Sequence, residues 1–452
     1  MANEQFLKLL RQGVSAWNAQ RLHERNPYTD LSAVELPRIQ LAKGKLESVN
    51  FRGSNLSGAD LRKADLRNAD LSETDLRDAD LRGADLTEVN FTYADLRGAN
   101  LKRATCAKAV FVEARLGGVR LEDTDLSGAN LRGALLSNMD LTKVNLARAD
   151  LHKAKLIGTI LKGADLREAT LVDALFESAK LHAADLRGAN MKDAVFTGAN
   201  FSHANLAECD FGKCRIDHAV FAGATLSGAL FLKLDLRDLR FDQADLTKAI
   251  FTEANLTGAI LQKANLTDAL FAGATLTGAD LREACCNETE FVRAMLVSAV
   301  LDGADLTNAD MTGANLVAAR IAEVRGWESL RVVGANVTGI RGAPKGFRDW
   351  ATKHNARVQP PISILDQGAG VWNIWIAENR GQKIRLKDLN LYGRELLNID
   401  LTGVDLSGAT LDEATLTEAQ FDGARLERVR ARRAGFLEAS FRGASLKDAD
   451  FG

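Results

Sequence analysis

The chain of 452 residues has little cysteine, proline, tyrosine and tryptophan: five Cys, five Pro, three Tyr and five Trp. An odd number of Cys at irregular spacing does not form a disulfide framework. No run of about 18 apolar residues occurs, so we expect no membrane span. The N-terminal segment lacks the apolar core and cleavage site of a signal peptide, and we therefore expect a cytoplasmic protein.

An excess of charge of either sign is also nearly absent, because basic and acidic residues almost balance. The formal net charge is −2, which predicts neither direct nucleic-acid binding nor a strongly acidic surface. The sequence has no phosphate-binding glycine loop, HExxH helix, nucleophile elbow or CxxC pair. We therefore expect a protein that is no enzyme and has no cofactor and no metal.

Leucine and alanine are abundant, and they recur with a period of five. From Leu31 to Ile321, every fifth residue is Leu, Phe, Ile, Met or Cys, and the residue two places earlier is mostly Ala. A helix would spread such centres around its axis, and a flat strand would send successive centres to opposite faces. The chain must therefore turn once per repeat. Gly58 and Gly83 stand two places after a centre, where a turn with positive φ favours glycine.

Phenylalanine indicates how many repeats close one coil. Eight of the thirteen Phe centres fall in one class with a spacing of twenty, which stacked aromatic rings explain. The sequence thus predicts four pentapeptides per coil. The eight centres are Phe51, Phe91, Phe111, Phe211, Phe231, Phe251, Phe271 and Phe291.

The repeat Ala94-Asp95-Leu96-Arg97-Gly98 shows the motif in full. It resembles the pentapeptide repeat family, and the resemblance extends over residues 31–321 and 384–452. It implies an all-β solenoid, a right-handed quadrilateral β-helix with Leu, Phe and small residues inside. Some relatives protect DNA gyrase or topoisomerase IV by imitating the size and charge of B-DNA.

We divide the chain into four segments. Residues 1–30 form an N-terminal capping helix and lead-in, with Phe6, Leu9, Leu10, Val14 and Trp17 on one face of a helix over 5–20; few basic residues line it, which disfavours a membrane-surface helix. Residues 31–323 form the first β-helix. Residues 324–383 hold a closing helix near 345–355, then a strand or hairpin and a Trp-rich linker over 358–383. Residues 384–452 form a second, shorter block.

The last coil of the second block needs a cover. Either the insert folds over it or a second chain pairs with it in a homodimer, and we favour the homodimer slightly. Whether the two blocks stack into one rod or form separate rods stays open.

A non-catalytic protein-binding scaffold or adaptor is the function that this pattern favours. Its candidate contacts are Trp350, Trp372, Trp375, Arg425, Arg428, Arg430, Arg432 and Arg433, since Trp and Arg are enriched in binding hot spots. The partner is a protein that the sequence does not identify, with no direct nucleic-acid and no membrane contact.

Duplex mimicry toward a topoisomerase is the alternative function. Its candidate surface is an acidic stripe formed by Asp65, Asp85, Asp125, Asp165 and Asp185. Residues 29–323 sum to −7 over a predicted length of roughly 70 Å, whereas duplex DNA carries about 40 phosphates in that length. The charge deficit therefore favours the scaffold.

Cysteine and histidine positions predict no further chemistry. Cys209 and Cys214 take small-residue positions, which favours buried thiols over a metal site. Cys285 is predicted to point outward. His182 and His203 share a face, but two histidines alone do not make a metal site.

Overall fold

The computed structural model describes residues 4–21 and 28–452. The predicted segment 1–30 therefore includes residues 1–3 and 22–27, which lie outside the described residues. The chain divides into two compact units, Met1–Ala254 with Ile260–Ala269 and Asn255–Ala259 with Leu270–Gly452, and each is described by itself. In the described part of the chain, no helix is long and apolar enough to cross a bilayer.

Each pentapeptide of the first unit is a tight turn followed by one residue that bridges to a neighbouring coil. In the repeat centred on Leu61, the turn residue Lys63 has φ 56°, and the Ala64 N–H donates to the Leu61 carbonyl at 3.0 Å. A side chain in this left-handed region costs roughly 1–2 kcal/mol, which favours glycine. Gly58 and Gly83 indeed take this position with φ 64°, so the predicted turn is confirmed.

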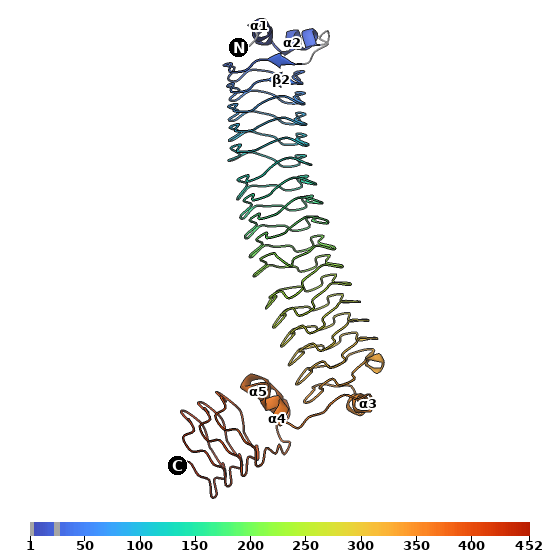
Figure 1. Ribbon diagram of the computed structural model, residues 1–452, viewed down its shortest axis with the longest axis vertical. Helices are drawn as coiled ribbons and strands as arrows, with labels where there is room; N and C mark the ends of the chain where they lie inside the picture. The colour runs from blue at the N-terminus through green and yellow to red at the C-terminus, as the bar shows by residue number, and fades with distance from the viewer. Residues whose placement is uncertain (1–3, 22–27) are drawn as a thin grey trace. The chain divides into compact units, whose positions relative to one another are not determined.

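Parallel bridges join residues twenty positions apart. β1 (Thr29–Asp30) pairs with β2 (Val49–Asn50), and single-residue bridges such as that of Gln40 with Asp60 continue the ladder. A coil therefore contains four pentapeptides, as the phenylalanine spacing predicts. Successive coils stack within each unit (Figure 1).

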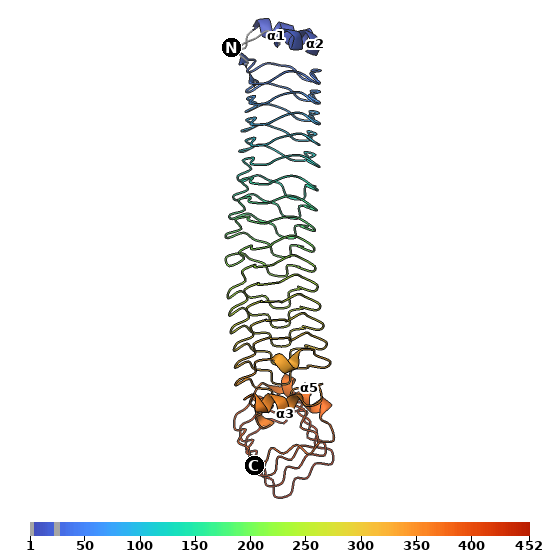
Figure 2. The same ribbon diagram turned by 90° about the vertical axis from the view of Figure 1, so that its right-hand side faces the viewer.

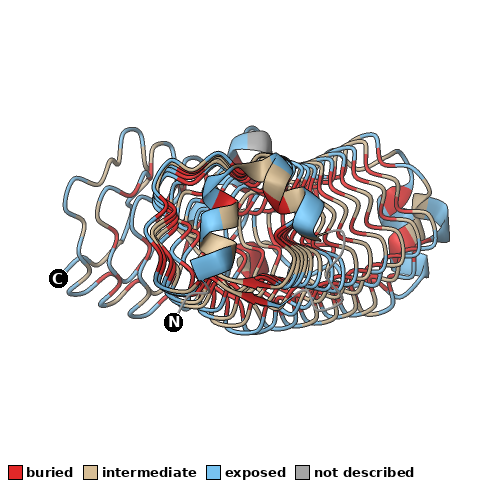
Figure 3. Cartoon of the chain, turned by 90° about the horizontal axis from the view of Figure 1, so that it is seen from above, coloured by how far each residue is buried: buried red, intermediate tan, exposed pale blue. Residues whose placement is uncertain are grey.

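The core of the first unit lies inside the coils. Seen along the stack, buried residues line the inner side of each coil and exposed residues the outer side (Figure 3). Phe211, Phe231 and Phe251 are fully buried, and their rings stack at centroid distances of 4.8 and 4.9 Å. The predicted one-ring-per-coil ladder is thus present.

Replacing one phenylalanine of this ladder tests how much the stacked rings contribute to the free energy of unfolding. We expect Phe231→Ala to lower the free energy of unfolding by about 3–5 kcal/mol, because it opens a cavity between two stacked rings. Phe231→Leu, which keeps most of the volume, should cost less than about 1.5 kcal/mol. Denaturant unfolding of both variants measures the difference, and equal losses would contradict the stacked core.

Two helices precede the first coil, where the sequence predicts one. α1 (Glu4–Arg11) and α2 (Val14–Arg21) are separated at Gly13, whose φ is 112°. Leu10 and Trp17 are buried, with 1% and 0% of their surface exposed. Figure 2 shows both helices lying across the end of the first coils.

In the second unit the repeat continues beyond residue 323, so the predicted end of the first β-helix is too early. Asp310 bridges Arg331 and Arg320 bridges Arg341, each pair 21 positions apart. One extra residue, close to the 3-10 helix η1 (Trp327–Ser329), therefore shifts the phase. The loss of the five-residue spacing after residue 321 is an insertion within the stack.

Three helices follow in the insert. α3 (Phe347–Lys353) stands where the closing helix is predicted. The strand or hairpin predicted over 358–383 is wrong, because α4 (Ile362–Leu365) and α5 (Ala369–Glu378) occupy this segment. Trp372, Trp375 and Ile376 have helical spacing and are buried together, and this packing outweighs the low helix propensity of the local glycines.

The second repeat block is present as predicted. Bridges with a spacing of twenty run from Arg385, paired with Asp405, to Arg430, paired with Asp450. The insert reaches the first coil of this block, where the Trp372 indole donates to the Asp400 carbonyl at 2.6 Å. The homodimer at the last coil stays a prediction.

Candidate interaction surfaces

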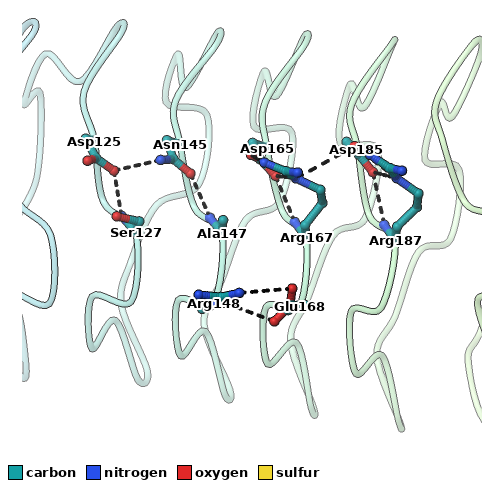
Figure 4. Close-up of polar contacts among 10 residues, drawn as sticks. All are labelled: Asp125, Ser127, Asn145, Ala147, Arg148, Asp165, Arg167, Glu168, Asp185 and Arg187. Atoms are coloured by element: carbon teal, nitrogen blue, oxygen red, sulfur yellow. Dashed lines mark hydrogen bonds and ion pairs between the residues drawn. The ribbon is translucent and has the colours of Figure 1, made fainter.

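The five acids of the predicted stripe lie on one face of the first unit. Each occupies the bridging position before a centre, and bridges link Asp65 to Asp85 and Asp165 to Asp185. Asn145 stands between Asp125 and Asp165 in the same row (Figure 4). The repeat thus aligns the row, as the sequence predicts.

The fold itself uses these carboxylates. The Asp165 Oδ1 accepts the backbone N–H of Arg167 at 3.1 Å, and the Asp125 Oδ1 accepts that of Ser127 at 3.0 Å. An Asp or Asn side chain that bonds the backbone two residues on stabilises a turn. This structural role explains why Asn145 can replace Asp in the row, with its Oδ1 accepting the Ala147 N–H.

Arginines two residues after three of the acids neutralise them. Arg67 forms a two-pronged pair with Asp65, at 2.8 and 2.7 Å. Arg167 pairs in the same way with Asp165, and Arg187 pairs with Asp185 at 2.7 Å (Figure 4). Two-pronged pairs between a guanidinium and a carboxylate are the stronger kind of charged hydrogen bond.

The remaining acids of the stripe have polar neighbours. The Thr87 hydroxyl donates to Asp85 at 2.6 Å, and the Asn145 amide donates to Asp125 at 2.8 Å. The stripe is therefore a row of local turns and ion pairs, with much of its negative charge cancelled. The sequence motif Asp-Leu-Arg indicates these ion pairs, because its first and third residues lie on the same edge of a coil.

The pairing changes the ionisation of the acids. The hydrogen bond from Arg67 lowers the pKa of Asp65, and the hydrogen bond from Arg167 lowers the pKa of Asp165, with smaller help from the backbone and against the effect of burial. The same bonds raise the pKa of both arginines. Each pair is therefore charged at neutral pH, and the carboxylates take up a proton only in acid.

Acid should destabilise the protein through these carboxylates. A carboxyl whose pKa is lowered by folding contributes stability above its unfolded pKa of about 3.9, and this contribution is lost as the pH falls through the folded pKa. We expect a melting temperature that changes little between about pH 7 and 5 and falls below about pH 4.

The double variant Asp65→Asn/Asp165→Asn tests whether these carboxylates cause the loss of stability in acid. It keeps the turn oxygens and removes two charges, so its melting temperature should fall less between about pH 4 and 2, with a cost of about 0–1 kcal/mol per exposed pair at neutral pH. Thermal melts across this range measure both slopes. If the melting temperature of the variant falls as steeply with pH as that of the unaltered protein, the ion pairs do not cause the acid sensitivity.

The arginine cluster of the second block is mostly paired within the chain. Arg430 contacts Asp412 at 2.7 Å and Arg432 contacts Asp450 at 2.8 Å. Arg425 contacts Glu427 at 3.2 Å and Asp405 at 3.8 Å. These three arginines therefore contribute to the fold of the block.

Arg428 and Arg433 are the more available members. Among the described residues Arg428 has no ion-pair partner and is exposed. Arg433 has 84% of its side chain exposed and approaches Glu413 only to 3.9 Å. They occupy turn positions of consecutive pentapeptides, with φ 57° at both.

The three tryptophans of the insert pack inside the chain. Trp372 has 0% and Trp375 has 8% of its surface exposed, which leaves neither side chain available to a partner in this structure. Trp350 is half-buried and packs edge-on against Trp327 at a ring distance of 5.4 Å. Their contact role stays a prediction, and burial disfavours it for Trp372 and Trp375.

The reactive side chains do not assemble into a site. Burial raises the pKa of the Cys209 and Cys214 thiols to about 12, consistent with the predicted buried positions. The rings of His182 and His203 lie 5.3 Å apart. Within residues 4–21 and 28–452, no group of three or more His, Cys, Asp or Glu could hold a metal ion.

Four pentapeptides per coil, with one on each face, and coils that stack on one another define the class of protein: a four-sided β-solenoid. The sequence matches pentapeptide repeats (8 copies) over residues 45–83, 64–103, 90–128, 124–163, 145–182, 159–198, 249–285, 284–321, 395–433 and 419–452. It matches a pentapeptide repeat region over 192–261. More than half of the chain is covered, and the chain belongs to the pentapeptide repeat family, whose members form right-handed quadrilateral β-helices.

Solved structures of the family resemble parts of the chain. A pentapeptide repeat protein from the thylakoid lumen of Arabidopsis thaliana is 38% identical, with 19% of this chain and 66% of that protein covered and a TM-score of 0.17. HetL, involved in heterocyst differentiation regulation in Nostoc, is 23% identical, with 74% and 96% covered and a TM-score of 0.20.

Trypsin-treated QnrB1, a plasmid-mediated fluoroquinolone resistance protein, is 16% identical, with 47% of this chain and 92% of that protein covered and a TM-score of 0.28. No curated protein matches the chain. The family match supports a repeat scaffold, and no comparison identifies its partner.

Proposed function

We propose that the chain is a non-catalytic, cytoplasmic scaffold that binds a protein partner through the outer faces of its coils. The supporting observation is that each position of the pentapeptide has its own structural role. The centre and the small residue fill the core, and the bridging residue holds the ladder, as Leu61, Ala64 and Asp65 show. The two turn residues carry the exposed side chains, which are therefore the ones that a partner can contact.

Arg428 and Arg433 are the contacts that the geometry favours. Both project from turns at neighbouring positions of one coil and keep most of their hydrogen-bonding capacity for a partner. Guanidinium groups bind carboxylates in a two-pronged geometry. The partner surface that fits them is acidic.

Duplex mimicry is the alternative, and the pairing of the stripe disfavours it. A topoisomerase that binds DNA would meet Asp65, Asp165 and Asp185 already joined to arginines. Free phosphates of a duplex present one full charge about every 1.7 Å. A neutralised row imitates this field poorly.

Co-purification with matched variants distinguishes the two functions. We expect Arg428→Ala/Arg433→Ala to weaken partner binding at least about tenfold, as the loss of an arginine contact at the centre of an interface does. Arg103→Ala/Arg148→Ala removes equal charge from side chains that are 83% and 73% exposed elsewhere, and it should leave binding unchanged. Titration of the recovered partner against each variant gives the measurement.

The opposite pattern would favour mimicry. Topoisomerase subunits would then bind the arginine variants as well as the unaltered protein and bind Asp165→Asn/Asp185→Asn less well. The unaltered protein would compete with duplex DNA for these subunits. Turnover of a substrate by the chain's own residues would contradict both functions.

A further inference from the structure

The helices before the two repeat blocks share one sequence pattern. Residues 10–18 read LRQGVSAWN and residues 365–373 read LDQGAGVWN, with Leu, Gln, Gly, Trp and Asn at matching positions. Each residue stands 355 positions from its counterpart, a multiple of five. The following centres also correspond, since Leu31 matches Leu386 and Leu46 matches Leu401.

The two segments have the same backbone. A glycine with positive φ separates two helices in each, Gly13 with φ 112° and Gly368 with φ 98°. Trp17 N–H donates to the Gly13 carbonyl at 3.2 Å, and Trp372 N–H donates to the Gly368 carbonyl at 3.1 Å. Both indole rings have 0% of their surface exposed.

They also make the same contacts with the first coil. The Trp17 indole N–H donates to the Lys45 carbonyl at 2.8 Å, as the Trp372 indole N–H donates to the Asp400 carbonyl at 2.6 Å. The Asn18 Oδ1 accepts the Lys45 N–H at 2.7 Å.

The second asparagine repeats this arrangement. The Asn373 Oδ1 accepts the Asp400 N–H at 2.7 Å, and its amide donates to the Asn398 carbonyl at 2.7 Å. The Asn18 amide donates likewise to the Lys43 carbonyl at 3.0 Å. Three hydrogen bonds thus recur between equivalent atoms.

These contacts replace a missing coil. One coil further on, the Asp65 N–H donates to the Gly44 carbonyl at 2.9 Å, and the Asp65 carbonyl accepts the Leu46 N–H at 2.6 Å. Lys45 lies in the first coil, and among the described residues no backbone group of an earlier coil bonds its N–H or its carbonyl. The indole N–H supplies the donor and the asparagine Oδ1 supplies the acceptor, which satisfies both backbone groups at an exposed edge.

The second block has the same arrangement one coil after its start. The Gln420 N–H donates to the Ile399 carbonyl at 2.8 Å, and the Gln420 carbonyl accepts the Leu401 N–H at 2.7 Å. Asp400 has Trp372 and Asn373 in place of these two backbone partners. Within residues 270–452, no bridge joins a residue before 385 to this block.

We infer that the Trp-Asn pair with its preceding Gly is a cap used twice, and that residues 362–452 are a second β-helix that starts at its own cap. The second block is therefore not a continuation of the first stack. Its stability depends on the local cap, as the end of a solenoid depends on a capping element. Each block thus starts from a cap of its own.

Hydrogen–deuterium exchange of the full chain tests this inference. Asn373→Ala leaves the Asp400 N–H without its acceptor, and we expect exchange about tenfold faster in peptides from 385–411. Peptides from 31–60 should keep their rates. Asn18→Ala should produce the reverse pattern.

Two further variants keep the result interpretable. Asn379→Ala removes an amide that donates to the Trp375 carbonyl of α5, so it should leave the second block protected. Trp372→Phe keeps a six-membered aromatic ring and removes the indole N–H donor together with the five-membered ring, and it gives the readout if Asn373→Ala does not fold. Faster exchange in both blocks with either variant, or in neither block, would overturn the inference.

Discussion

The hydrogen bonds between successive coils are the interaction on which the rest of the structure depends. The Leu61 N–H reaches the Asp80 carbonyl at 2.8 Å, and the Lys63 N–H reaches the Arg82 carbonyl at 3.0 Å, so every coil satisfies its neighbour. This ladder holds the centres over one another, and the rings of the core can stack only because of it. It also holds residues such as Lys63 in a left-handed turn that they would otherwise avoid.

The hydrogen bonds between coils also determine which surface charges are neutralised within the chain and which are available to a partner. A side chain at the bridging position lies at the edge of a turn whose N–H groups face it. An Asp at this position therefore stabilises the turn, and its charge is only partly available to a partner. Arg167 then lies within reach of Asp165, and the pair is neutral as seen from outside. Charge that a partner can use must come from turn residues that the fold leaves unpaired, such as Arg428.

Much of the fold could be predicted from the sequence because one physical requirement repeats in every pentapeptide. The period of five, the four-sided coil and the second block all follow from the buried centres. The insertion near residues 326–330 could not be predicted, since one extra residue destroys the spacing but not the ladder. Gly368 and Gly370 concealed α5, which tertiary packing of Trp372 stabilises. The pairing of an acid with the arginine two residues later could not be predicted from a count of charges per face, because such a count does not say which atoms meet.

Length in such a chain is quantised. Because bridges join residues twenty positions apart, adding or removing one whole coil leaves every later residue on its own face. Adding one pentapeptide instead turns all later faces by a quarter of the coil, which would break the Phe211–Phe231–Phe251 stack and scatter any row of contacts. A row of surface residues can thus lengthen by whole coils with no other change in the sequence. An insertion of one pentapeptide instead requires new residues at every later surface position.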